Sequence, residues 1–142
     1  MGVSWRQRWD RLPVAARCAL VIIALGFAEG LRSHIADLVR GGLGVYSPFG
    51  SVAVQAFFLS LVIVDPIVIV LVVSARAAGV WLAVVVMVAD FAVNVSVSWP
   101  RVREDWWWLV LPTGALPLTF FTVFVVATAT ALARRLTRGH LE

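Results

Sequence analysis

Lysine is absent from this sequence, and charged residues of both signs make up only 14% of its 142 residues. Hydrophobic residues make up 61%, whereas soluble domains are about 45–50% apolar. The mean hydropathy of +0.94 points the same way. This composition argues against a water-soluble fold and predicts an integral membrane protein with one domain, residues 1–142.

Cysteine occurs once and histidine twice. The single cysteine, Cys18, cannot form an intrachain disulfide, and its apolar neighbours predict a small buried residue. The histidines are His34 and, in the C-terminal tail, His140, which excludes bis-histidine haem ligation within a helix bundle. The motifs HExxH, paired CxxC and G-K-[ST] are also missing. We therefore predict neither a metal site nor a cofactor.

Residues 1–12 lack the features of a secretory signal peptide, because they are basic and aromatic and no small-residue cleavage site follows the first apolar run. Trp5 and Trp9 are four residues apart, so they share a face if this segment is helical. Such a face suits the headgroup region of a membrane, although a short flexible terminus fits the sequence equally well. At the other end, residues 141–142 are interpreted as the remnant of a tag linker.

Four long apolar segments predict four transmembrane helices, at about residues 13–39, 51–74, 80–98 and 113–133. A helix rises about 1.5 Å per residue and needs about 20 residues to cross a hydrocarbon core of about 30 Å. The predicted fold is therefore an all-α, four-helix membrane bundle. Proline lacks the N–H that continues a helix and biases the residue before it away from helical geometry. We thus expect the second helix to be broken or kinked at Asp65-Pro66.

The arginines lie mostly at the ends of the apolar segments, which is the pattern of membrane topology signals and not of nucleic-acid binding. With four spans, both termini lie on one side, together with the connection that contains Arg76. That side carries eight arginines and the other side four, so the positive-inside rule predicts cytoplasmic termini. The use of arginine alone for positive charge, with abundant alanine, valine and glycine, suggests a GC-rich genome and hence the inner membrane of a bacterium.

The connection before the last span holds four tryptophans: Trp99, Trp106, Trp107 and Trp108. Three consecutive helical residues point in three directions, so the last three of them are not expected in a core. Tryptophan is enriched at membrane interfaces, and we predict an interfacial position for all four and for the two N-terminal tryptophans. A stacking platform for a carbohydrate or a base is the alternative.

Polar groups at membrane depth form the candidate site. A carboxylate inside a bilayer is costly and by default suggests a functional role. The candidates are distributed over three predicted spans: Glu29, His34, Asp37, Gln55, Asp65, Asp90 and Asn94. Gln55 shares a helical face with Asp65, and Asp90 shares one with Asn94. Because the short connection at residues 75–79 makes the second and third spans antiparallel neighbours, Asp65 and Asp90 could meet near mid-depth.

Two neighbouring carboxylates with no basic residue at their depth would not both be ionised. The least costly arrangement is a protonated aspartate that is hydrogen-bonded to the second carboxylate, to an amide or to a backbone carbonyl. Such a pair suits proton-coupled transport, cation binding or acid catalysis. The alternative is structural, because hydrogen bonds between helices contribute about 0.6 kcal/mol on average and could simply hold the bundle together.

The function expected from these residues is to bind or transport a proton, a cation or a hydrophobic small molecule between the helices. One alternative is a membrane enzyme that acts on a lipid- or sterol-like substrate by acid/base chemistry. A second is an accessory or scaffolding subunit that uses Gly26 and Gly30 as a helix-packing face. Besides membrane lipid, the expected partners are further copies of the chain in a dimer or larger homo-oligomer, because four short helices enclose little volume. Nucleic acid is not an expected partner, and the sequence alone identifies no family.

Overall fold

The computed structural model describes residues 5–110 and 115–138. Within these ranges the chain contains helices and their connections but no strand. Its α-helices are α1 (Trp5–Asp10), α2 (Val14–Gly41), α3 (Val52–Val73), α4 (Ala77–Glu104) and α5 (Ala115–Arg138). Short 3-10 helices lie in the connections: η1 (Gly42–Gly44), η2 (Ser47–Phe49) and η3 (Trp106–Leu109).

Four of these helices are long and apolar enough to cross a membrane, namely α2, α3, α4 and α5. This confirms the predicted all-helical fold with four candidate spans. Some helices extend beyond the predicted spans, since hydropathy marks the apolar part of a helix and not its polar ends. Thus α4 runs to Glu104 and includes Trp99 and Pro100, which the sequence pattern assigns to the connection. The predicted boundary at residue 113, like residues 141–142, lies outside the described ranges.

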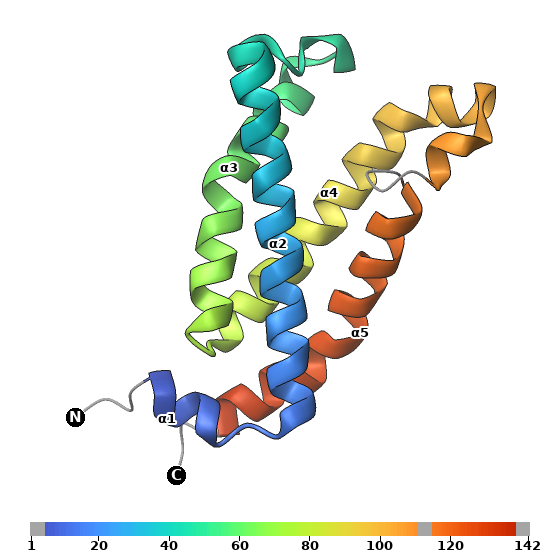
Figure 1. The fold of residues 1–142 in the computed structure, drawn as a ribbon. Coiled ribbons are helices and arrows are strands. Elements are labelled where there is room, and N and C mark those ends of the chain that lie inside the picture. Colours follow the sequence, from blue (N-terminus) through green and yellow to red (C-terminus); the bar gives the residue numbers. More distant parts are fainter. Residues whose placement is uncertain (1–4, 111–114, 139–142) are drawn as a thin grey trace.

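Figure 1 shows two helix pairs that meet at a common centre. α2 lies along α3, α4 lies along α5, and α3 and α4 also pack together. α1 and the C-terminal end of α5 lie at one end of the molecule, which we call the terminal end. The 3-10 helices η1, η2 and η3 lie at the opposite end, which we call the loop end. The position of each candidate site residue can therefore be given along the line that joins the terminal end to the loop end.

The N-terminal end of α3 is capped by Ser51, whose hydroxyl accepts a hydrogen bond from the Val54 amide at 3.4 Å. The helix then continues through Asp65 and Pro66 without interruption. Pro66 has no N–H to donate, so the carbonyl of Val62 is left without its helical partner. α3 is thus not broken at this dipeptide, and the kink stays a prediction.

The most fully buried side chains lie in the half of the bundle nearer the terminal end. Six large side chains there are less than 2% exposed: Leu20, Ile23, Val68, Val72, Val80 and Val125. Protein interiors packed in this way leave few voids larger than a water molecule. This group, which we call the apolar plug, separates the centre of the molecule from the terminal end.

The outer faces of the helices are apolar as well. Leu25, Ile63, Val70 and Phe120 are each more than 60% exposed, and helices that are apolar all round are typical of membrane spans. Cys18 is also exposed, so the expectation of a buried residue is wrong. The buried stripe of α2 follows positions 16, 20, 23 and 27, and Cys18 lies on another side of the helix.

Gly79 lies where the start of α4 packs against the end of α3. A Cβ atom built on Gly79 would lie 2.7 Å from the carbonyl carbon of Leu71 and 2.7 Å from the amide nitrogen of Val72. Backbone atoms cannot move aside as a side chain can, so we expect Gly79→Ala to lower the free energy of unfolding by about 1–3 kcal/mol. Gly44→Ala is the matched control, because nothing lies within 4 Å of its built Cβ. Thermal unfolding in detergent, followed by circular dichroism, measures the difference, and equal stability of both variants would contradict the close approach.

Candidate functional site

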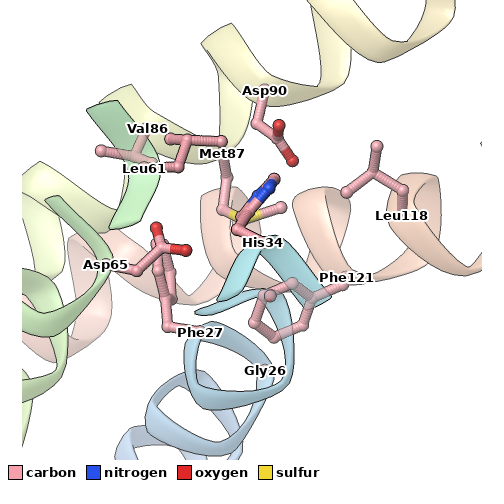
Figure 2. A pocket seen from close by; sticks show the side chains of 11 residues that line it. Gly26, Phe27, His34, Leu61, Asp65, Val86, Met87, Asp90, Leu118 and Phe121 are labelled. Carbon is pink, nitrogen blue, oxygen red and sulfur yellow. The ribbon is translucent and has the colours of Figure 1, made fainter. Parts of the chain in front are cut away.

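A cavity of about 70 Å³ lies between α2, α3, α4 and α5 (Figure 2). Its polar lining consists of three predicted site residues, His34, Asp65 and Asp90. The rest of the lining is glycine and apolar side chains: Gly26, Phe27, Gly30, Leu61, Val86, Met87, Leu118 and Phe121. A water molecule needs roughly 10–15 Å³ of such volume, so the cavity has room for a few waters or a small ion.

Asp65 on α3 is buried, with 4% of its surface exposed. Its carboxylate lines the cavity, and a Cβ atom built on Gly30 of α2 would lie 3.4 Å from its Oδ2 atom. The absence of a side chain on Gly30 therefore leaves space for this carboxylate between two helices. Among the described residues, no side chain donates a hydrogen bond to Asp65. Because the carboxylate faces an otherwise largely apolar cavity, a proton, a cation or water there would stabilise it.

Asp90 on α4 lines the same cavity, and Figure 2 shows the two carboxylates on two sides of His34. The side-chain amide of Asn94, one turn further along α4, donates to Asp90 Oδ1 at 2.8 Å and to the Asp90 carbonyl at 3.0 Å. These bonds hold the Asp90 carboxylate in one orientation. The structure therefore brings Asp65, Asp90 and Asn94 together at one cavity.

His34 on α2 connects the cavity to a second polar group. Its Nδ1 atom is 3.0 Å from Tyr46 Oη, and that hydroxyl donates to Asp37 Oδ2 at 3.4 Å. The rings of Tyr46 and Phe58 flank the imidazole, with centroids 6.2 and 6.1 Å from its own. His34 and Asp37, both predicted site residues, are therefore joined through Tyr46.

If the Asp37 carboxylate is ionised, this hydrogen-bond chain indicates which nitrogen of His34 carries the proton. An ionised carboxylate only accepts hydrogen bonds, so Tyr46 gives its hydroxyl hydrogen to Asp37 and must accept one from His34. Nδ1 of His34 is then protonated, and Nε2 of the neutral ring keeps a free lone pair. In this arrangement the imidazole can take up a proton at Nε2 and release one at Nδ1.

No family model, curated protein or solved structure matches this chain. Its function is therefore inferred from the chemistry of the cavity. Two carboxyl groups and an imidazole can bind, release and pass on protons. Within the described ranges, no group of three or more His, Cys, Asp or Glu side chains is arranged to hold a metal ion.

Two predicted site residues lie away from the cavity. The side chain of Glu29 is 65% exposed and is paired with Arg32 through hydrogen bonds of 2.8 and 2.6 Å. Consecutive helical residues point about 100° apart, so Glu29 cannot share the face that Gly30 presents to the cavity. Gln55 lies near the start of α3, where its amide donates to the Gly50 carbonyl at 3.3 Å.

Gly26 and Gly30 face side chains of other helices, and not the backbone of another helix. A Cβ atom built on Gly26 would overlap the ring of Phe121 from α5, with Cε1 only 2.6 Å away. Phe121 also packs edge-on against Phe27, with ring centroids 6.2 Å apart. Gly30 faces Asp65. Both glycines thus make room for groups that line the cavity.

Tyr46 and Phe121 are site residues that sequence reasoning does not identify. Tyr46 lies in a glycine-rich connection and Phe121 is one of many apolar residues in the last span, so the pattern of polar groups marks neither of them. One signal for Tyr46 is its position five residues after the end of α2 at Gly41, which is close enough for its ring to fold back onto that helix. No comparable signal pairs Phe121 with Gly26, because the contact joins the first and last spans across the bundle.

The tryptophans assigned to the membrane interface are mostly exposed. Four of them expose more than half of their surface: Trp5, Trp99, Trp106 and Trp107. Trp9 donates its indole N–H to the Val73 carbonyl at 2.6 Å and so ties α1 to the end of α3. The side chain of Trp108 lies outside the described part of the chain. Exposed indoles at the ends of apolar helices suit a membrane interface, and this position stays a prediction.

Tyr46 is the single tyrosine of the chain, so its ionisation can be followed by ultraviolet absorbance. Burial, together with the charge of Asp37, raises the pKa of Tyr46 to about 12. The ordinary pKa of tyrosine is about 10, so the stability that this burial implies is fully present below about pH 10 and is lost as the pH rises through 12. We expect tyrosinate to form near pH 12 in the folded protein and near pH 10 after denaturation. A folded-state midpoint near 10 would contradict the buried position.

Proposed function

We propose that this chain is a small polytopic membrane protein that exchanges a proton for a small cation at the cavity between Asp65 and Asp90. The main support is that two carboxyl groups face one cavity between four helices with the length and hydropathy of membrane spans. Acidic residues at membrane depth are rare and mark ion pathways and proton relays. A purely structural pair would be expected to satisfy its hydrogen bonds within the protein, whereas Asp65 has no donor among the described side chains.

The chemistry of the pair favours a proton and a cation as competing ligands. Two carboxylates in one apolar cavity repel each other unless a proton or another positive charge lies between them. A proton on one of them removes the repulsion, and a bound cation does the same. Binding of one therefore displaces the other, which is the basis of exchange.

The size of the cavity supports a small ligand. Pockets for drug-sized molecules have volumes of about 300–1,000 Å³, whereas this cavity measures about 70 Å³. That is enough for a small ion with some of its water. Among the functions expected from the sequence, proton and cation exchange therefore agrees better with this arrangement than a hydrophobic ligand or a lipid-like substrate.

The position of the cavity supports transport and not only binding. The apolar plug lies between the cavity and the terminal end, whereas His34, Tyr46 and Asp37 lie between the cavity and the loop end. Alternating access requires a central site that is reached from one side at a time. We propose that a kink at Pro66, directly after Asp65, lets α3 bend when access changes, since proline is a common cause of helix kinks.

The setting of this activity is also part of the proposal. The chain would span the inner membrane of a bacterium with both termini in the cytoplasm, as the arginine distribution indicates. The loop end then faces the outside. The working unit would be a homo-oligomer, because the four helices enclose only a small volume and expose apolar faces.

The test uses purified protein in liposomes that enclose the pH-sensitive dye pyranine. Na⁺ or K⁺ is added outside, and the internal pH is followed. The native chain should change the internal pH faster than protein-free liposomes do, and Asp65→Asn and Asp90→Asn should return the rate to the protein-free level. Glu104→Gln, which changes an exposed acid at the end of α4, is the matched control and should behave like the native chain.

Two results would overturn the proposal. One is a protein-dependent signal that survives both aspartate variants. The other is a native chain that gives no protein-dependent signal with either cation, although circular dichroism shows that it is folded.

A further inference from the structure

We propose that His34, Tyr46 and Asp37 form a proton relay that joins the cavity to the loop end of the molecule. The inference rests on the proposed function, because it gives the route by which protons reach the site. It is carried by an unbroken series of hydrogen-bonding groups, from Nδ1 of His34 to Tyr46 Oη at 3.0 Å and from Tyr46 Oη to Asp37 Oδ2 at 3.4 Å.

The surroundings of the three residues fit a path from the interior to the surface. His34 lines the cavity with Asp65 and Asp90. Tyr46 is buried, with 4% of its surface exposed. The side chain of Asp37 is 38% exposed and lies 4.0 Å from Arg40. His34 at one end of the series therefore lines the cavity, and Asp37 at the other end is accessible to solvent.

The order of proton transfers follows from the hydrogen-bond directions. A proton leaves the carboxylic acid in the cavity, through water, and binds Nε2 of His34. The Nδ1 proton of His34 moves to Tyr46 Oη while the hydroxyl proton of Tyr46 moves to the carboxylate of Asp37. Asp37 then releases that proton to the solvent. The cavity loses one proton, the solvent gains one, and His34 is left neutral with its proton on Nε2. The ring must return to the Nδ1 tautomer of the resting protein before a second proton can leave; the reverse sequence carries a proton inwards and restores that tautomer.

Tyr46 suits the middle of such a relay because it gives and receives a proton in the same step. Burial and the nearby Asp37 charge raise the pKa of Tyr46 to about 12. The hydroxyl therefore stays protonated near neutral pH and passes protons on without storing a negative charge. Packing against Phe58 and Phe49, with ring centroids 5.0 and 6.2 Å away, holds the ring in place.

The charged groups around His34 are few. On its own helix the titratable neighbour is Asp37, from α3 the cavity brings Asp65, and from α4 it brings Asp90. The α5 residues at the cavity are Leu118 and Phe121, which carry no charge. Among the described residues, the titratable groups at the relay and the cavity are therefore these three acids, Tyr46 and His34 itself.

The experiment distinguishes proton binding in the cavity from proton transfer along the relay. Protein in detergent is subjected to a pH jump, and the carboxyl bands are followed by time-resolved infrared spectroscopy. The amplitude that disappears in Asp65→Asn reports protonation of the cavity, and its rate reports access. Tyr46→Phe and Asp37→Asn should keep this amplitude but slow its rate by about 10²-fold, the range of a lost acid–base group.

Thr128→Val is the matched control. It also removes a hydroxyl, here half-buried, but that of Thr128 only bonds the Phe124 and Val125 carbonyls of its own helix. Its rate should equal that of the native chain. An unchanged rate in Tyr46→Phe and Asp37→Asn, with an amplitude that depends on Asp65, would overturn the relay and leave the proposed function standing. An amplitude that persists in Asp65→Asn would overturn the proposed function and the relay with it.

A second measurement tests the relay geometry directly. His140→Gln leaves His34 as the single histidine, and its ring can be labelled with ¹⁵N for nuclear magnetic resonance. At a pH where the ring is neutral, we expect the proton on Nδ1, and in Tyr46→Phe a mixture of both tautomers. A neutral ring with its proton on Nε2 in the otherwise native chain would contradict the assigned hydrogen-bond directions.

Discussion

Asp65→Asn is expected to abolish proton exchange without lowering the stability of the folded protein. The amide has nearly the shape of the carboxyl group, but it cannot bind or release a proton. The proposed exchange needs two carboxyl groups at this buried position, so Asp90 alone cannot sustain it. The exchange rate in pyranine-loaded liposomes should therefore fall to that of protein-free vesicles.

The expected stability of the Asp65 variants follows from the lack of side-chain hydrogen bonds to Asp65 among the described residues. Among the described side chains none donates to Asp65, so the substitution breaks no side-chain hydrogen bond. Even a buried ion pair can often be replaced by apolar residues of similar volume with no loss of stability or with a gain of about 1–4 kcal/mol. We expect Asp65→Leu to unfold at or above the native temperature in detergent, and Asp65→Asn to unfold near it.

The matched comparison is Asn94→Leu on α4. Its amide makes two hydrogen bonds to Asp90, and their loss should lower stability by about 1–3 kcal/mol because a half-buried carboxylate loses its donor. If Asp65 instead holds the helices together, Asp65→Asn and Asp65→Leu will both destabilise the protein, as Asn94→Leu does. That result would favour a structural role for Asp65. It would contradict the expectation that Asp65, like many active-site residues, lowers stability for the sake of function.

Several features of the site could be predicted because they depend on one helix or on two consecutive ones. Helical periodicity is enough to put Asp90 and Asn94 on one face, and they are hydrogen-bonded. The short connection between α3 and α4 makes these helices antiparallel neighbours, which is why Asp65 and Asp90 reach the same cavity. Hydropathy alone indicates four helices, because the burial of apolar surface in a bilayer needs no knowledge of their packing.

Other features depend on how the first helix is rotated, which the sequence pattern does not determine. α2 is apolar on several sides, so the orientation of Glu29 depends on its partners and not on periodicity. In the structure Gly30 faces Asp65 and Glu29 is paired with Arg32 on the surface. The contact between Tyr46 and His34 depends on the path of the glycine-rich connection, where few residues restrict the backbone.

Gly26→Ala is expected to destabilise the protein by about 1–3 kcal/mol, which is typical for an added methyl group in a packed core. The built Cβ atom overlaps the ring of Phe121, so the ring must leave its place between Gly26 and Phe27. Because Phe121 lines the cavity, the displacement should also change the rate of proton exchange. Denaturant unfolding in detergent measures the first effect, and the liposome assay measures the second.

A second substitution should restore much of the loss. Leucine at position 121 is smaller than phenylalanine and has no rigid ring, so Phe121→Leu leaves room for a methyl group at position 26. On its own Phe121→Leu is destabilising, because it removes the ring contacts to Phe27. In the double-mutant cycle we expect a favourable coupling of about 0.5–3 kcal/mol between the two positions, as for residues in direct contact.

Gly30→Ala separates this explanation from the alternative that the two glycines form an interface between two copies of the chain. Its built Cβ would be in ordinary contact with Asp65 Oδ2, at 3.4 Å, so its effect on stability should be much smaller than that of Gly26→Ala. An intermolecular GxxxG face would require both glycines for close backbone approach. Both alanine variants would then weaken the oligomer in analytical ultracentrifugation, and Phe121→Leu would rescue neither of them. Rescue of Gly26→Ala alone, without a change in oligomeric state, would place the first glycine opposite the Phe121 ring within one chain.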